Sequence, residues 1–193
     1  MRIEKTNSVN FNANFVNDKV QIKKLVKGSL DSYEDCKAYL VKIDCYNRND
    51  INVLCDISRF WQQGNLATNI YYAACAVRNG SKYYKGHEVY ALTTQKSDYN
   101  QLDCDKVLGL IHTSYEPDGT ILIEQLQANP DIIYAIQPEY KGIGSGILAS
   151  LKDFTNKICC HPSPASVTKF YEKNGFGKCD GTCNTRYAWT KNK

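Results

Sequence analysis

Long apolar runs are missing from the sequence. No stretch stays apolar over the roughly 20 residues that a membrane-spanning helix needs, and residues 1–7 (MRIEKTN) lack the apolar core of a signal peptide. We therefore expect a soluble, cytoplasmic protein with no membrane partner. A strong excess of one charge is also missing, because 24 basic residues stand against 20 acidic ones, a net charge of +4. This balance gives no reason to expect a nucleic-acid partner.

Cysteine is plentiful, but the spacing that structural zinc sites use is absent. The nine cysteines are odd in number and stand in a chain without an export signal, which argues against a disulfide framework. A zinc-dependent interaction module is a rival interpretation, with ligands from Cys159, Cys160, His161, Cys179 and Cys183. Consecutive residues of a strand point to opposite faces, however, and no Cys-x-x-Cys pair occurs. We therefore expect no metal.

No internal repeat or low-complexity linker divides the chain. A length of 193 residues, 42% of them hydrophobic, is enough for one compact core. We expect an irregular N-terminal arm over residues 1–18 and a single domain over residues 19–193. Periodicity predicts helices at residues 33–43, 50–61, 66–77, 144–158 and 165–173, and strands at residues 20–26, 88–93, 106–112, 120–128, 158–160 and 186–189.

The sharpest local motif is Lys-Gly-Ile-Gly-Ser-Gly at residues 141–146, directly before an amphipathic helical pattern. Glycines let the backbone turn tightly, and a helix start offers unpaired N–H groups with a partial positive charge. Lys141 adds a full positive charge. The motif therefore predicts an anion site suited to phosphate or pyrophosphate, although a plain glycine-rich turn before a helix would look the same.

This motif, Lys141-x-x-Gly144-x-Gly146, resembles the Arg/Gln-x-x-Gly-x-Gly/Ala pyrophosphate loop of the GNAT superfamily of acyl-CoA N-acyltransferases. Further segments are similar to that family in the same order: residues 107–111 to its third strand, 123–130 to its fourth, FYEKNGF at 170–176 to its last helix and turn, and 187–189 to its closing strand. The resemblance implies an α/β fold of the GNAT type. Such a fold has a mixed, mostly antiparallel sheet of about seven strands, split at the cofactor wedge, with helices on both faces.

The resemblance also implies how acetyl-CoA, the co-substrate, would bind. Its pantetheine arm would pair like an added strand with the backbone of Leu126, Gln127 and Ala128. Its pyrophosphate would bind the backbone amides of Gly142, Ile143, Gly144, Ser145 and Gly146, beside Lys141. The reaction would be acetyl transfer to a primary amine by direct attack in a ternary complex. A catalytically silent acyl-CoA sensor is the alternative function.

Two residues are implied as catalytic. Tyr171 stands where the family's tyrosine protonates the departing thiolate. The acceptor amine must lose a proton, and at neutral pH this costs roughly 4 kcal/mol for a lysine-like amine with a pKa near 10.4. Glu124 stands two residues before Leu126 and is expected on the same face of the strand, which makes it our candidate base. The weaker candidates are His112, Glu116 and Glu139.

Some segments depart from the family pattern. Lys141 replaces Arg or Gln, and Pro164 and Val167 stand where the family often has Asn and Ala. Ten residues, 131–140, separate the fourth strand from the glycine motif; an alternative alignment makes residues 132–136 the fourth strand. We expect segments 29–86 and 131–140 to border the acceptor side without touching the pyrophosphate, the second as a pocket wall or as a plug in the core. The acceptor stays open, and a homodimer is possible.

Overall fold

A computed structural model describes residues 14–61, 65–96, 102–164, 167–179 and 186–191. Within these residues, nine strands form one sheet in the order β6-β1-β2-β3-β4-β5-β7-β9-β8. The resemblance implied about seven strands, and the two additional ones, β6 and β8, are each only two residues long. The strands are β1 (Asn14–Leu25), β2 (Tyr33–Lys42), β3 (His87–Thr93), β4 (Val107–Tyr115), β5 (Ile121–Ala128), β6 (Tyr140–Lys141), β7 (Lys157–Cys160), β8 (Gly177–Lys178) and β9 (Tyr187–Thr190).

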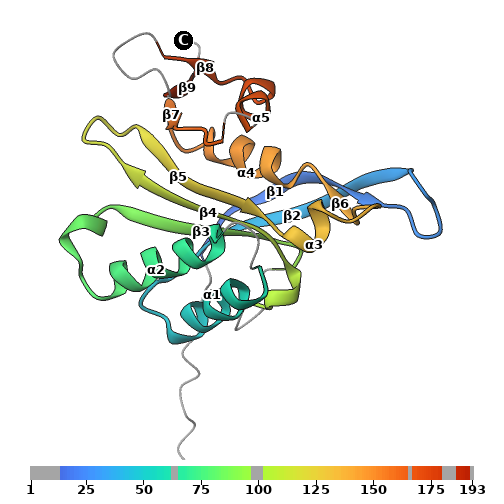
Figure 1. The fold of residues 1–193 in the computed structure, drawn as a ribbon, viewed down its shortest axis with the longest axis horizontal. Coiled ribbons are helices and arrows are strands. Elements are labelled where there is room, and N and C mark those ends of the chain that lie inside the picture. Colours follow the sequence, from blue (N-terminus) through green and yellow to red (C-terminus); the bar gives the residue numbers. More distant parts are fainter. Residues whose placement is uncertain (1–13, 62–64, 97–101, 165–166, 180–185, 192–193) are drawn as a thin grey trace, which may run out of the picture.

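Helices cover both faces of the sheet, as the resemblance implied (Figure 1). The helices are α1 (Arg48–Phe60), α2 (Leu66–Arg78), α3 (Pro130–Ile133), α4 (Ile143–Leu151) and α5 (Thr168–Lys173), with short 3-10 turns η1 (Lys82–Tyr84) and η2 (Cys104–Lys106). On one face, α1 and α2 bury Leu54, Ile57 and Ile70 in a core with Leu110 of β4. On the other face, α4 buries Ile147 in a second core with Ile111 of β4. In the described part of the chain, no helix is long and apolar enough to cross a membrane.

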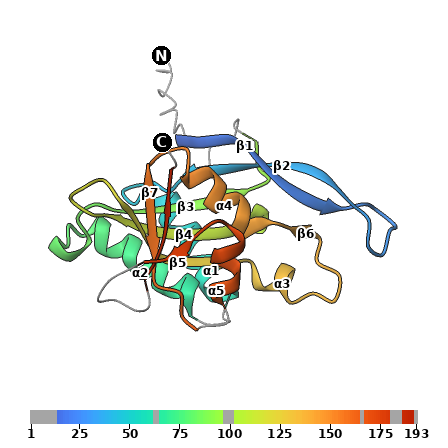
Figure 2. The same ribbon diagram turned by 90° about the horizontal axis from the view of Figure 1, so that it is seen from above.

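The sheet is antiparallel except at one join, between β5 and β7, which pair in parallel. This pairing covers only residues 121–123 of β5, opposite Ile158, Cys159 and Cys160, whereas β5 stays paired with β4 as far as Ala128. The two strands therefore separate after Ile123. This separation is the predicted split in the sheet, and Figure 2 shows α4 and α5 on the same side of it.

The predicted helix at residues 33–43 is wrong, because this segment is strand β2. Its apolar residues do recur at spacings of three and four, but the structure sends them to two different cores. Leu40 packs in the core beside α4, and Ile43 packs in the core beside α1 and α2. A strand buried on both faces needs apolar residues on both sides, and such a pattern imitates helical periodicity.

Other element boundaries also shift. The arm predicted over residues 1–18 ends earlier, because β1 starts at Asn14 and pairs irregularly with β2 between Phe15 and Val20; residues 1–13 lie outside the described part. The helix predicted at 144–158 ends at Leu151, since the chain must turn there to enter β7. The last helix is described from Thr168, and residues 165–166, where its start was predicted, lie outside the described part. The helices at 50–61 and 66–77 and the later strands are confirmed.

Candidate active site

The glycine-rich motif forms the N-terminus of α4. Gly142 is the N-cap, and its φ of +83° is one that residues with a side chain rarely adopt. The first intrahelical bond runs from the Gly146 amide to the Gly142 carbonyl (2.8 Å). Helix geometry leaves the amides before it, at residues 143–145, without intrahelical acceptors, and they carry the positive end of the helix dipole. The motif therefore forms the glycine turn and helix start that its sequence predicts.

Two glycines of the motif are needed for close packing rather than for a turn. A Cβ atom at Gly146 would lie 2.8 Å from Cγ1 of Val20 on β1, and one at Gly144 would lie 2.9 Å from Cζ of Phe170 on α5. Gly109 of β4 also allows close packing, because a Cβ atom there would lie 2.8 Å from Cγ2 of Ile143 on α4. Small residues at these points allow α4 to lie directly on β4, next to the end of β5.

A cavity of about 470 Å³ lies at this helix start. The end of β5 contributes Leu126 and Ala128, and α5 contributes Phe170. The remaining lining residues are Ile133, Pro138, Tyr140 and residues 141–145. The sequence analysis missed Phe170, although it belongs to the FYEKNGF run that carried the resemblance. A second cavity on the far side of the motif shares Lys141, Gly142 and Ser145 and adds Lys23, which is ion-paired with Asp35 (3.0 Å).

The segment 131–140 lies beside the glycine-rich motif. Residues Ile133, Pro138 and Tyr140 line the same cavity as the glycines. The middle of the segment is not a plug in the core, because Tyr134 is 68% exposed and Ile136 is fully exposed, whereas Ile132 and Tyr140 near its ends pack against the core. The C-terminal end of the segment is bound to β1 by backbone hydrogen bonds: β6 pairs with β1, and the Leu25 amide donates to the Glu139 carbonyl (2.8 Å).

Strand β5 presents different side chains to the two faces of the sheet. Leu126 and Ala128 face the cavity, whereas the buried Gln127 side chain accepts a hydrogen bond from the Ala67 amide in the first turn of α2 (2.6 Å). Gln127 could therefore contact a cofactor through its backbone alone. Because β7 departs after Ile123, no described strand pairs with the outer edge of residues 124–128. An extended ligand could add to that edge as a strand does.

Glu124 does not share the face of Leu126, so that expectation is wrong. The register between β4 and β5 shifts between the pairs Thr113–Ile123 and His112–Gln125, which leaves Glu124 as an extra residue in a bulge. Its exposed carboxylate accepts a hydrogen bond from Ser114 Oγ (2.6 Å). A bulge breaks the two-residue alternation from which the prediction was made. Glu124 still lies where the two strands begin to separate.

Tyr171 is buried at the opposite side of the split, 8% exposed. Its ring packs edge-on against Phe170 (5.1 Å between ring centroids) and Phe176 (5.4 Å). Burial has the largest effect on the pKa of Tyr171 and the nearby Cys160 adds to it, so that this pKa lies well above that of a free tyrosine. The phenol is therefore protonated at neutral pH and has a proton to donate.

The weaker candidate bases have other partners. Glu116 is ion-paired with Arg186 (2.7 Å), and Glu139 lies 3.6 Å from Lys24. His112 is 4% exposed and contacts His87. Glu124 directly follows the last residue of β5 that pairs with β7, and His112 pairs with the next residue, Gln125.

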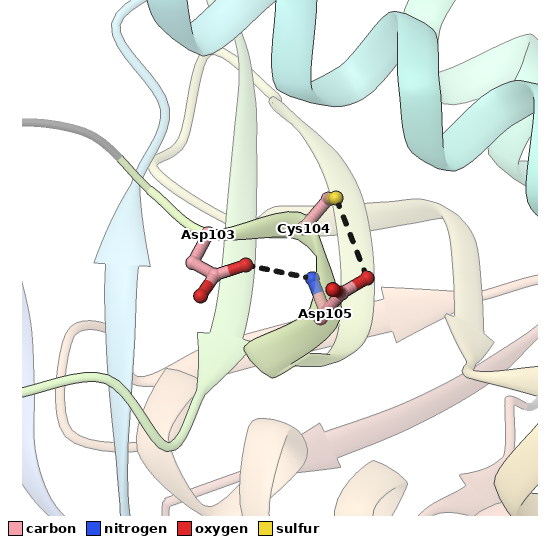
Figure 3. A group of neighbouring side chains, drawn as sticks. All are labelled: Asp103, Cys104 and Asp105. Atoms are coloured by element: carbon pink, nitrogen blue, oxygen red, sulfur yellow. Dashed lines mark hydrogen bonds between the residues drawn. The ribbon is translucent and has the colours of Figure 1, made fainter.

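The described residues contain one group with the spacing of metal ligands, Asp103, Cys104 and Asp105 (Figure 3). Its atoms already bond to one another: Asp103 accepts from the Asp105 amide (3.1 Å), and Cys104 Sγ donates to Asp105 (3.7 Å). Asp103 is also 3.3 Å from Lys106. This group is a capped turn before β4. Of the cysteines considered for zinc, Cys159 and Cys160 are buried in β7, and Cys183 lies outside the described residues.

Comparison with known proteins gives matches among solved structures. No family model and no curated protein matches the chain. A structure assigned to the GNAT acetyltransferases, from Desulfovibrio desulfuricans, has a TM-score of 0.51 and 13% identity, covering 79% of this chain and 98% of that one. A structure assigned as an acetyltransferase, from an Exiguobacterium species, has a TM-score of 0.49 and 17% identity over 79% and 93% of the two chains. PaiA N-acetyltransferase from Thermoplasma acidophilum, in complex with coenzyme A, has values of 0.47 and 12% over 79% and 98%. The match with a TM-score of 0.51 shows that the chain has the fold of the GNAT acetyltransferases.

Proposed function

We propose that the protein is an N-acetyltransferase that moves an acetyl group from acetyl-CoA to a primary amine. One observation carries the proposal: β5 leaves β7 after Ile123 and opens an unpaired backbone edge beside a cavity walled by the start of α4. A pantetheine arm is extended and has amides that pair with such an edge. The helix start supplies the donors that a pyrophosphate needs.

The pyrophosphate and the pantetheine arm each have residues of matching chemistry. The amides of Ile143, Gly144 and Ser145 would bind the pyrophosphate, with Lys141 as a neighbouring cation. Leu126 and Ala128 would contact the pantetheine through backbone groups and apolar side chains. The cavity of about 470 Å³ lies in the range typical of small-molecule sites.

The residues at the split have the chemistry for direct transfer. Glu124 would accept a proton from the acceptor ammonium, so that the free amine attacks the thioester carbonyl. A C–N bond forms and the C–S bond breaks. Tyr171 would then give its proton to the departing thiolate, as a general acid. The helices α1 and α2 lie on the face of the sheet opposite α4. They belong to the segment that resembles no family pattern, and they would contribute to acceptor choice.

Ser145 gives a clean test of cofactor binding, because its exposed side chain borders both cavities. Ser145→Asp would place a negative charge where the pyrophosphate would lie, while an acidic residue in the first turn favours the helix. Ser145→Asn introduces a side chain of nearly the same size as aspartate but without the charge. We expect calorimetry to show CoA binding weakened at least tenfold by Ser145→Asp and nearly unchanged by Ser145→Asn. Equal binding by both variants would contradict the site.

Activity needs an assay that is blind to protein thiols, because the chain has nine cysteines. Acetyl-CoA and CoA would be separated by chromatography after incubation with small amines, peptides with free N-termini and lysine peptides. Acetylated amine appearing with CoA in equal amount supports the transferase. CoA binding without transfer to any amine supports the sensor alternative.

A further inference from the structure

Two lysines stand opposite each other at the edge of the sheet. Lys23 of β1 and Lys141 of β6 are direct partners in the antiparallel pairing of these strands. Side chains at directly opposed positions leave the sheet on the same face and lie close together, and like charges in this arrangement are destabilising. An anion beside the two ammonium groups would remove this repulsion.

A neighbouring carboxylate offsets part of the charge. Asp35 of β2 is the partner of Lys23 in the next strand, and its carboxylate lies 3.0 Å from the Lys23 ammonium. The two side chains are 58% and 76% exposed, and an ion pair so open to water is weak. Two lysines and one aspartate leave a net charge of +1. Lys23 can therefore exchange Asp35 for a stronger anion at little cost.

Both lysines line a cavity of about 460 Å³ beside α4. Ile22 of β1 and Ala149 of α4 are among its other lining residues. Among the described residues around this cavity, Lys23, Lys141 and Asp35 are the charged ones. The cavity lies in the size range of small-molecule sites. Its chemistry suits a ligand that has both an apolar ring system and a negative charge.

This cavity and the one beside β5 meet at the start of α4. Lys141, Gly142 and Ser145 line both of them. A molecule with its pyrophosphate on the amides of residues 143–145 could therefore extend one arm into each cavity. In CoA, these arms are the pantetheine and the 3′-phosphorylated adenosine. The pantetheine belongs in the first cavity, because Leu126 and Ala128 of β5 line that one.

We propose that the second cavity binds the 3′-phosphoadenosine of CoA, with the 3′-phosphate beside Lys23 and Lys141, an inference that rests on the proposed function. A phosphate monoester carries roughly −1.5 to −2 charges at pH 7, which matches two lysines better than one carboxylate does. Lys23 would then exchange Asp35 for the phosphate. The protein would therefore prefer CoA to dephospho-CoA, which differs only by the missing 3′-phosphate.

The test measures the Kd of CoA and of dephospho-CoA by calorimetry with the full chain. The parent should bind CoA about tenfold more tightly, as expected of hydrogen bonds to a charged group at a partly exposed site. Lys23→Met keeps most of the aliphatic stem and loses the charge. This variant should bind CoA about tenfold more weakly than the parent and dephospho-CoA equally well, so the preference disappears.

Lys37 of β2 gives a matched control. It is the cross-strand partner of Gln21, two residues before Lys23, so it projects from the same face of the sheet. It is exposed and does not line the cavity. Lys37→Met removes the same charge and should keep the parent's preference for CoA. An equal loss of preference in both variants would show that net charge acts from a distance, and it would overturn the contact with Lys23.

The outcomes separate this inference from the proposed function. If the parent binds neither ligand, the proposed cofactor site fails and this inference fails with it. If the parent binds both equally, or if Lys23→Met keeps the preference for CoA, the place of the 3′-phosphate alone is overturned and the cofactor site stands. Lys23 is exposed, so the variant should keep the melting temperature of the parent.

Discussion

The Lys141 ammonium lies 3.7 Å from the centroid of the Tyr33 ring, a contact between the glycine-rich motif and the β1–β2 hairpin. The same tyrosine donates a hydrogen bond from its hydroxyl to the Pro138 carbonyl (2.8 Å). Tyr33 therefore fixes both the cation beside the proposed pyrophosphate site and one wall of the cavity. The family resemblance gave no hint of this residue, because it lies outside the part of the chain that the resemblance covers.

Replacing Tyr33 tests the value of this contact. Tyr33→Leu removes the ring and should weaken CoA binding about fivefold, since an exposed cation–π contact contributes about 0.5–1 kcal/mol. Tyr33→Phe keeps the ring and loses only the hydroxyl, so its Kd by calorimetry should stay within about twofold of the parent. A Tyr33→Leu variant that binds CoA like the parent would show that Lys141 needs no support.

Two isoleucines of the segment 131–140 form a matched pair. Ile133 lines the proposed cofactor cavity and is 47% exposed, whereas Ile136 is fully exposed and does not line it. Ile133→Ala should weaken CoA binding by about 1 kcal/mol, because apolar contact area is lost, and Ile136→Ala should leave the Kd unchanged. Similar binding by both variants would remove this segment from the cofactor site.

Gly146 should tolerate a methyl group only when its neighbour is trimmed. Gly146→Ala forces a methyl against Val20 Cγ1, on a stiff β-branched side chain, and should lower the free energy of unfolding by about 1 kcal/mol or more. In a Val20→Ala background the same change should be neutral or stabilising, because alanine is the better helix former. Urea denaturation of the four proteins measures this coupling, and additive effects would contradict the packing.

Tyr171→Phe should lower kcat by a factor of roughly 10² to 10⁴ and leave the Kd for CoA unchanged, because the hydroxyl acts only when the thiolate leaves. The ring keeps its contacts with Phe170 and Phe176, so the melting temperature should hold. Single-turnover kinetics with a confirmed amine would measure the step. An unchanged kcat would leave Tyr171 with a packing role alone.

His112 should make the protein less stable in mild acid. Its pKa in the folded protein is about 4, below the ordinary value of 6.5, because burial and His87 disfavour the charged ring. As the pH falls from 6.5 toward 4, the unfolded chain binds a proton that the folded protein refuses, so stability is lost over this window. The loss should approach about 3 kcal/mol, at 1.36 kcal/mol for each pKa unit.

The comparison protein for this measurement is His112→Gln, which cannot titrate. Denaturation at several pH values should give the parent a steeper fall in the free energy of unfolding than the variant between pH 6.5 and 4. Parallel curves would show that His112 titrates normally. Because the neighbouring His87 and Glu124 are present in both proteins, the difference between the two curves reports His112.

The sequence predicted the site where the signal was local. Gly142 needs a positive φ at the start of α4, and the helix behind it has a clear apolar stripe, so this turn could be placed from neighbouring residues alone. The FYEKNGF run located α5 and Tyr171 for the same reason. Strands β3, β4 and β5 were found because each alternates or runs apolar between clear turn residues.

Tertiary structure decided the features that depend on distant partners. Residues 33–42 satisfy a helical spacing and a two-sided strand equally well, and only pairing with β1 and β3 selects the strand. The bulge at Glu124 arises from register with β4, so the face of this carboxylate was not encoded in β5 itself. The pairing of His87 with His112 joins residues 25 apart. Local spacing fixes backbone geometry over one turn or strand, whereas burial and register are set by contacts between segments that the chain brings together only on folding.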